Sequence, residues 1–202
     1  MSAKGHGTPL ALIRHGTTEW NTDGRIQGST DIPLSEIGRA EVRSWKVPAE
    51  FRDFVWISSP LARARETAAL LGANSVAIEP RIREMDWDQW EGLTLADLRK
   101  NFAAELASKE ARGVDFHAPG GESPRQVMAR IELWLADIAE AGKPTVAVTH
   151  KGVVRAALAL ATGWDMQDKW PVKIDWSSVQ LFAVDDEGRL TAERLNIAMA
   201  PP

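Results

Sequence analysis

The architecture follows from one apolar run that ends in polar residues, Leu10-Ala11-Leu12-Ile13-Arg14-His15-Gly16. Four consecutive apolar residues followed at once by polar ones are typical of a strand that is buried on both faces of a sheet. Residues 54–57 and 146–148 form two further runs of this kind. Longer segments with helical periodicity separate the three runs, which predicts an α/β fold with a mainly parallel central sheet.

The remaining segments complete the predicted architecture. Residues 76–78 form a weaker fourth strand, and residues 179–184 and 190–195 flank a turn-rich segment, which predicts an antiparallel hairpin at the C-terminal edge of the sheet. Since no repeat and no linker rich in Pro, Gly or Ser interrupts the chain, we expect a single domain over residues 1–202, a three-layer α/β/α sandwich. Helical periodicity marks residues 34–45, 60–71, 95–109 with a break, 123–141 and 152–161.

Two of these helices begin with recognisable capping residues. Ser123, Pro124 and Gln126 combine an N-cap hydroxyl, a proline in the first turn and the glutamine of a capping box. Ser59 is likewise expected to cap a helix that Pro60 begins.

Composition limits the classes of function. The chain has 202 residues, a formal net charge of −4 and no cysteine. The lack of cysteine excludes disulfides, a thiol nucleophile and cysteine-ligated metal sites, and the acidic charge argues against broad nucleic-acid binding. Residues 1–8 lack an apolar stretch and no run of about 18 apolar residues occurs, so we expect neither a signal peptide nor a membrane span. We therefore expect a cytoplasmic protein.

Three strand ends carry residues that are suited to an anion. His15 follows the first strand, His150 follows a later one, and Arg63 lies in the first turn of the helix after the second strand. Because the carboxyl ends of parallel strands meet at one edge of a sheet, we expect these side chains and Arg14 to converge. A guanidinium beside a helix N-terminus favours phosphate or carboxylate. Taken singly, each has a plainer interpretation, a packing histidine or a solvated arginine.

The order of the motifs along the chain adds a resemblance. Arg14-His15-Gly16, with Thr18 and Asn21 behind it, is followed by blocks at residues 31–38, 58–64, Glu84 with 90–92, 119–123 and 149–150. In content and order these blocks resemble the histidine phosphatase superfamily, the cofactor-dependent phosphoglycerate mutase-like group. The resemblance covers about residues 10–160. Arg-His-Gly by itself is common, whereas the ordered set is specific.

The resemblance implies a phosphohistidine mechanism without metal or cofactor. His15, as a neutral imidazole, would attack phosphorus while its other ring nitrogen donates to a backbone carbonyl near Gly16. Glu84 would protonate the leaving alkoxide and then, as a carboxylate, activate the water that hydrolyses the phosphohistidine. The phosphoryl oxygens would be held by Arg14, Arg63 and His150.

The resemblance places further residues around the substrate. Thr18 and Asn21 would bond to phosphate oxygens or to the residues that hold them. Gln27 and Gly28 lie in the loop that meets the rest of the substrate in relatives. The expected partner is a small-molecule phosphomonoester, and a homodimer is left open.

Two residues depart from the family pattern. Lys151 stands where Gly usually follows the second histidine, and we expect it at the rim of the phosphate pocket. Asp88 stands where Gly usually precedes the Trp-Glu-Gly segment, and a positive φ there would strain an aspartate. Trp87 and Trp90 either line an apolar pocket or belong to the core.

Three functions remain: a phosphomonoesterase, a phosphoglycerate mutase, and a phosphate-binding domain without catalysis. Mutases of this superfamily carry a longer insert between the acid and the second histidine, and an Arg-His pair directly after the acid. Here Met85 and Asp86 follow Glu84, which favours hydrolysis over transfer. All five residues of the expected mechanism are present, which argues against loss of catalysis. The substrate stays open among sugar phosphates, phosphoserine, phosphoglycerates and α-ribazole phosphate.

Overall fold

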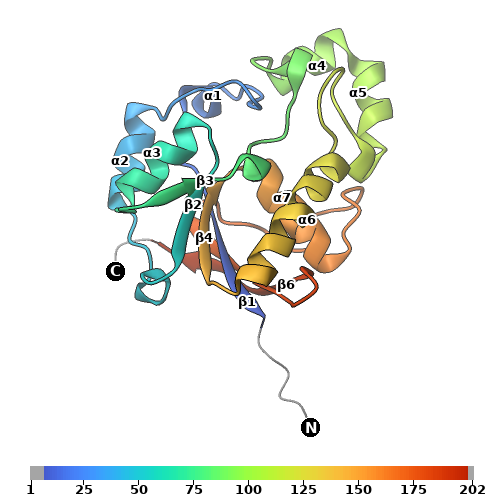
Figure 1. Cartoon of the computed structure of the whole chain (residues 1–202). Coiled ribbons are helices and arrows are strands. Elements are labelled where there is room, and N and C mark those ends of the chain that lie inside the picture. The colour runs from blue at the N-terminus through green and yellow to red at the C-terminus, as the bar shows by residue number, and fades with distance from the viewer. Residues whose placement is uncertain (1–6, 200–202) are drawn as a thin grey trace.

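One sheet contains six strands: β1 (Thr8–Arg14), β2 (Val55–Ser58), β3 (Val76–Ile78), β4 (Thr145–Thr149), β5 (Ser178–Val184) and β6 (Leu190–Ala198). The structure, a computed structural model, describes residues 7–199, without the side chains of residues 105 and 108–110. The spatial order is β3-β2-β4-β1-β5-β6 (Figure 1). The first four strands pair in parallel, and β5 pairs antiparallel with β1 and β6. The predicted sheet, parallel with an antiparallel C-terminal edge, is confirmed.

Helices cover both faces of the sheet, as Figure 1 shows. α2 (Glu36–Ser44) and α3 (Ala62–Leu70) lie on one face, and α6 (Pro124–Ala141) and α7 (Lys151–Thr162) lie on the other. The predicted three-layer sandwich is therefore confirmed. Above the carboxyl ends of the parallel strands lie α1 (Glu19–Thr22) and α4 (Leu95–Asn101), with α5 (Ala103–Glu110) next to α4. Short 3-10 turns are η1 (Ala49–Phe51), η2 (Pro80–Ile82), η3 (Asp88–Trp90) and η4 (Gly113–Asp115).

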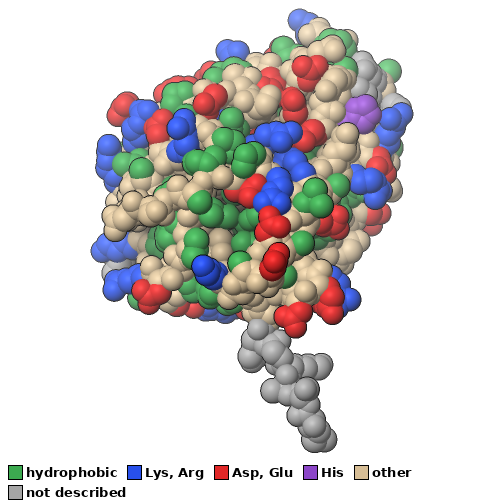
Figure 2. Space-filling model, in the orientation of Figure 1, with side chains coloured by type: hydrophobic (Ala, Val, Ile, Leu, Met, Phe, Trp, Pro, Cys, Tyr) green, Lys and Arg blue, Asp and Glu red, His purple; other side chains and the backbone are tan. Residues whose placement is uncertain are grey.

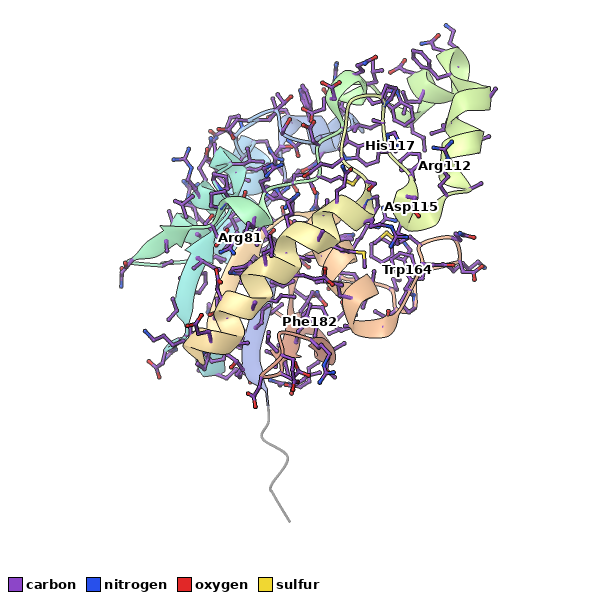
Figure 3. All side chains as sticks on the ribbon, turned by 45° about the vertical axis from the view of Figure 1, so that its right-hand side comes forward. Arg81, Arg112, Asp115, His117, Trp164 and Phe182 are labelled. Carbon is purple, nitrogen blue, oxygen red and sulfur yellow. The ribbon has the colours of Figure 1, made fainter. Side chains whose placement is uncertain are left out.

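Alternate residues of β1 pack into the two opposite layers. Leu10 and Leu12 belong to the cluster that contains the apolar stripe of α6, as does Phe182 of β5 (Figure 3). Ala11 and Ile13 belong to a second cluster, with Phe51. All four residues of the run are 0% exposed. The run is continuously apolar because both of its faces are covered.

Local signals fix the ends of several helices. The Ser123 side chain accepts from the amide of Gln126, and the Gln126 side chain accepts from the amide of Ser123, so the expected capping box is present. The predicted break within residues 95–109 separates α4 from α5 at Phe102, whose φ of −140° is not helical. α1 was not expected: it is a single turn, closed by a capping box of Thr18 and Asn21.

The predicted start of α3 was wrong. Leu61, not Ser59, is the N-cap residue, and its extended backbone delays the helix to Ala62. The Ala62 amide donates instead to a carboxylate oxygen of Asp31, at 2.6 Å. Ser59 Oγ accepts from Leu61 at 3.3 Å and lies 2.7 Å from Nε2 of His150. His150, which is distant in sequence, therefore contacts the Ser59 hydroxyl, and Asp31, which is also distant, caps the helix.

The surface carries mixed charge. Figure 2 shows basic and acidic side chains interspersed over the face that includes α6. Within residues 7–199, no helix is long and apolar enough to cross a membrane.

Candidate active site

His15 and His150 meet at the carboxyl ends of β1 and β4. These strands are adjacent and parallel, and Arg14 pairs with Thr149, so the residues that follow each strand are neighbours. The ring centroids are 5.1 Å apart, and the two histidines are 3% and 0% exposed. The expected convergence of the two strand ends is thus present in the structure.

The backbone selects the tautomer of His15. Nδ1 lies 2.7 Å from the carbonyl oxygen of Gly16, which can only accept, so Nδ1 carries the proton and Nε2 keeps a free lone pair. Burial lowers the pKa of His15 well below its usual value, and the charges of Arg14 and Arg63 lower it further. The ring is therefore a neutral imidazole, and its acceptor is the carbonyl expected from the sequence.

Ser59 holds the ring of His150. Its hydroxyl lies 2.7 Å from Nε2, whereas Nδ1 is buried with no hydrogen-bond partner in the described part of the chain. Burial, followed by the charge of nearby cationic groups, lowers the pKa of His150 well below its usual value. In a neutral ring whose Nε2 accepts from the Ser59 hydroxyl, Nδ1 is a free donor.

Arg63 is anchored by the loop that follows α1. Its two terminal nitrogens donate to the carbonyls of Thr30, at 3.0 Å, and Gly28, at 2.7 Å, and the residue is 0% exposed. Its Nε has no partner among the described residues, and neither has Nε of Arg14, although both atoms are buried. Buried donors without acceptors are costly. Nε of both arginines and Nδ1 of His150 could all be satisfied by one anion at this place.

Glu84 lies on the loop between η2 and η3 and is 6% exposed. Its Oε1 accepts from the amides of Met85, at 2.8 Å, and Gly152, at 3.0 Å. Burial raises the pKa of Glu84 above its usual value, although these hydrogen bonds and the charges of Arg63 and Arg14 oppose the rise. A carboxyl group whose pKa is raised in this way can serve as a proton donor.

The Glu84 loop is held from α6 and contains a strained turn. Nη2 of Arg130, on α6, donates to the carbonyls of Arg83 and Glu84, at 2.8 and 3.2 Å. Asp88 has a φ of +37°, so the position where the family pattern leads one to expect Gly does lie in the left-handed region. Its amide donates to the carboxylate of Asp86 at 2.9 Å, which supports the turn.

A cavity of about 360 Å³ opens in front of His15. Arg14, Glu84 and Lys151 contribute to its walls, and no group of three or more His, Asp or Glu side chains in the described residues is placed to hold a metal ion. A second cavity of about 470 Å³ adjoins it, because six residues line both: Ile26, Met85, Trp87, Pro124, Arg155 and Met166. Trp90 lines the second cavity and is 1% exposed. It is therefore both part of a pocket wall and part of the core, the two positions considered for the tryptophans.

The expected substrate-binding residues divide into two groups. Asn21, Gln27 and Lys151 line the cavity in front of His15. Thr18 and Gly28 do not belong to that lining. Thr18 is the N-cap of α1 and bonds through its hydroxyl to the side-chain amide of Gln27, at 3.1 Å, and the Gly28 carbonyl holds Arg63. Thr18 therefore supports Gln27, which lines the cavity, and Gly28 supports Arg63, which does not belong to the lining.

Sequence reasoning missed three residues that shape the site. Gly152 has no room for a side chain, because a Cβ there would collide with Oε1 of Glu84. Arg130 anchors the Glu84 loop, and Arg155 lines both cavities. Only Arg155 had a readable signal: it lies on the helix predicted over residues 152–161, four positions after Lys151, which directly precedes that helix.

Comparisons with known proteins identify the family. A family model described as the histidine phosphatase superfamily (branch 1) matches residues 10–198. Glucosyl-3-phosphoglycerate phosphatase of Mycolicibacterium vanbaalenii is 36% identical over 177 residues, which cover 81% of this chain and 77% of that protein. Phosphoserine phosphatase 1 of Hydrogenobacter thermophilus is 30% identical over 197 residues, which cover 93% and 92%.

A solved structure has the same fold with an anion in the complex. Mycobacterial glucosyl-3-phosphoglycerate phosphatase, in complex with VO3, superimposes with a TM-score of 0.78 at 27% identity, covering 96% of this chain and 100% of that one. With a family match over nearly the whole chain and phosphatases among its relatives, this chain belongs to the histidine phosphatase superfamily, branch 1, and is a phosphatase.

Proposed function

We propose that this phosphatase hydrolyses a small phosphomonoester through a phosphohistidine on Nε2 of His15. The Nδ1 proton is committed to the carbonyl of Gly16, so the lone pair of Nε2 is free to attack phosphorus. The observation that carries the proposal is a set of buried nitrogen atoms without partners in the described residues: Nε of Arg14, Nε of Arg63 and Nδ1 of His150, which is a donor when Nε2 accepts from Ser59. Three donors match the three phosphoryl oxygens that carry charge during transfer.

Glu84 would act in both half-reactions. In the first, the bond from phosphorus to the ester oxygen breaks as the bond to Nε2 of His15 forms, and the Glu84 proton passes to the departing oxygen. In the second, the Glu84 carboxylate takes a proton from a water that attacks phosphorus. The bond to Nε2 then breaks, inorganic phosphate leaves, and Glu84 is protonated again.

The size of the site favours a small phosphorylated metabolite. The cavity of about 360 Å³ suits a compact leaving group, and Asn21, Gln27 and Lys151 offer polar contacts to it. We propose substrates of the kind that the relatives' names give, phosphoserine or glucosyl-3-phosphoglycerate. A phosphometabolite panel, with released phosphate and product identity both measured, tests this choice. Transfer of the phosphoryl group in place of its release would favour the mutase.

Rapid-quench labelling tests the mechanism. Labelled substrate should leave an acid-labile, base-stable phosphoryl adduct on the wild type and none on His15→Ala, which should lose activity. Glu84→Gln should accumulate the adduct from p-nitrophenyl phosphate, because that leaving group needs no proton whereas the attacking water still needs a base. Full turnover by His15→Ala would refute the phosphohistidine.

Four further proposals accompany this function. Because arginines and a histidine supply the phosphoryl donors, we propose that turnover needs no metal. A chelator should leave the rate unchanged, and a rate restored only by added magnesium would contradict this.

The absence of cysteine supports a cytoplasmic location, which fractionation tests. A homodimer is tested by light scattering. Residues 1–202 are proposed to form one domain, since six strands share one sheet, and a single unfolding transition is expected.

A further inference from the structure

Two cations in front of His15 lack an anionic partner. Lys151 is the first residue of α7, and Arg155 follows one turn later. Both line the cavity that contains His15 and Glu84. Arg25, a third cation of this lining, pairs with Asp23 at 3.2 Å. In the part of the chain that the structure describes, no ion pair is formed by Lys151 or Arg155.

The placement of these two cations is electrostatically unfavourable. The N-terminus of a helix carries partial positive charge, which repels a lysine in the first turn. Like charges four residues apart on a helix repel each other. Burial lowers the pKa of Lys151, and the charges of Arg14 and Arg155 lower it further. The Glu84 carboxylate opposes the lowering of the pKa of Lys151. The repulsion among the cations remains, and a bound anion would compensate for it.

Aromatic rings hold both cations in fixed positions. The guanidinium carbon of Arg155 lies 5.6 Å from the ring centroid of Trp164 and 5.1 Å from that of Trp170. Nζ of Lys151 lies 5.6 Å from the ring of Trp176. The three indoles contact one another in series, with centroid distances of 5.3 and 5.8 Å. A side chain that is already immobilised loses less entropy when it binds a ligand.

The loop that carries the three indoles is itself anchored. The amide of Val114, in η4, donates to the carbonyl of Asp165 at 2.9 Å, and Figure 3 labels Trp164 and Asp115 on these two segments. Arg155 Nη2 lies 3.8 Å from the sulfur of Met166, and its buried Nε has no partner among residues 7–199. Nε of Arg155 is therefore free to donate a hydrogen bond to a ligand after the contacts that fix the side chain.

Arg155 also occupies the junction of the two cavities. It lines the cavity of His15 and the adjoining one that contains Trp90 and Phe116. Lys151 and Arg155 line the same cavity as His15, so both can contact the leaving group of a phosphomonoester whose phosphoryl group lies against His15.

We propose that Lys151 and Arg155 bind a second anionic group, a carboxylate or a further phosphoryl group, on the leaving-group part of the substrate. This inference rests on the proposed phosphatase function and names the class of substrate: a phosphomonoester with another anionic group. Arg155 is thereby a residue that determines specificity, and Lys151 acts with it. If the cations served only to hold the tryptophan loop, they would not distinguish between substrates.

Two pairs of matched substrates test the proposal. 3-Phosphoglycerate and glycerol 3-phosphate differ by a carboxylate against a hydroxymethyl group, and propane-1,3-diol bisphosphate and 3-hydroxypropyl phosphate differ by a phosphoryl group. The wild type should prefer the more anionic member of at least one pair in kcat/KM, by about 10-fold to 100-fold, as expected for hydrogen bonds to a charged group. Which pair shows the preference identifies the anion.

The variants Lys151→Met and Arg155→Met keep an unbranched apolar side chain and remove its charge. Each should lower that preference ratio by about tenfold, and Arg155→Lys should restore part of it. Because a ratio is measured, general losses of stability or turnover cancel. Lys173→Met is the matched control, since Lys173 is exposed and lies outside the lining of the His15 cavity.

The outcomes separate the two proposals. If no phosphomonoester is hydrolysed by the wild type, the proposed function fails. If all four compounds are hydrolysed but the wild type shows no preference, or the ratio is unchanged in both Lys151→Met and Arg155→Met, then only the second anion site is refuted.

Discussion

At the scale of single residues, Gly152 controls the position of the candidate acid. Its amide donates to Oε1 of Glu84, and a Cβ would collide with that oxygen and lie 3.2 Å from Cβ of Met85. Gly152→Ala should therefore displace the carboxyl group. We expect turnover of alkyl phosphates to fall by about 100-fold, and turnover of p-nitrophenyl phosphate, which needs no proton for its leaving group, to fall much less.

Gly24→Ala provides the control for this substitution. Gly24 has a φ of +69°, and a Cβ added there would meet no neighbouring atom within 4 Å, so alanine strains the backbone without touching the site. Its activity should match that of the wild type on both substrates. Equal losses on alkyl and aryl phosphates for Gly152→Ala would mean that the substitution acts through the phosphate donors and not through Glu84.

Asp88 and Gly120 form a second pair whose effects are coupled. Asp88 has a φ of +37°, a conformation that costs a non-glycine residue about 1 kcal/mol or more. Asp88→Gly should leave stability unchanged or raise it by up to about 1 kcal/mol. Gly120→Ala should destabilise, because its φ is +78° and its Cβ would collide with the Asp88 carboxylate. Urea unfolding of the double variant should show that Gly120→Ala costs less once the carboxylate is gone; strictly additive values would contradict the contact.

These residues also mark the limit of sequence reasoning. The site histidines and arginines could be placed because each follows a strand or begins a helix. A strained backbone at Asp88 could be expected from the sequence, because its neighbours matched a family block in which this position is usually Gly. The role of Gly152 could not be predicted, since its contact with Glu84 joins residues that are 68 positions apart.

At the scale of elements, α6 and α3 show which helix boundaries local sequence can predict. The start of α6 depends on Ser123 and Gln126, three positions apart, and the expected cap was confirmed. The start of α3 depends on Asp31, which is 31 positions from Ala62, and on His150, which is 91 positions from Ser59. A capping rule applied to neighbouring residues could not include partners that only the folded sheet brings together.

Arg130 links α6 to the Glu84 loop, and its removal should affect both stability and catalysis. Besides the carbonyls of Arg83 and Glu84, it pairs with Glu122 at 3.1 Å, where both side chains are largely buried. Arg130→Met should lower the free energy of unfolding by about 2–4 kcal/mol, because it leaves buried carbonyls unsatisfied and removes one of the two arginines that pair with Glu122. It should also lower turnover of alkyl phosphates more than that of p-nitrophenyl phosphate.

The control lies on the same helix. Arg125 pairs with Asp115 at the surface, where ion pairs contribute little, so Arg125→Met should change urea unfolding and turnover only slightly. An Arg130→Met protein as stable as Arg125→Met would show that solvent replaces the lost hydrogen bonds.

At the scale of the whole molecule, the sheet order explains why distant residues share one site. β1 is the first strand in sequence but lies inside the sheet, between β4 and β5. The chain passes to β2 and β3 and then returns to place β4 beside β1. The crevice at the carboxyl ends of such strands is where ligands bind in open α/β sheets. The site therefore depends on the completed sheet, and its buried titratable groups couple to global stability.

This coupling predicts how stability varies with pH. The folded-state pKa values of His15 and His150 lie well below the usual 6.5, so the unfolded chain binds protons that the folded chain does not. Their contribution to stability is complete above pH 6.5 and is lost as the pH falls toward the lowered values, with a slope of about 1.4 kcal/mol per pH unit for each histidine. The pKa of Glu84 is raised above 4.5, so its contribution has the opposite sign and is lost as the pH rises.

Between pH 4.5 and 6.5, the slope of the unfolding free energy against pH should therefore be raised by the two histidines and lowered by Glu84. Urea unfolding across this range should show stability that rises with pH in the wild type. His15→Gln should make the rise shallower, because one histidine proton is no longer taken up on unfolding. Glu84→Gln should make it steeper, because the opposing carboxyl proton is removed. A slope that neither substitution changes would place the pH dependence in other groups and would mean that these two residues are not titrated by unfolding.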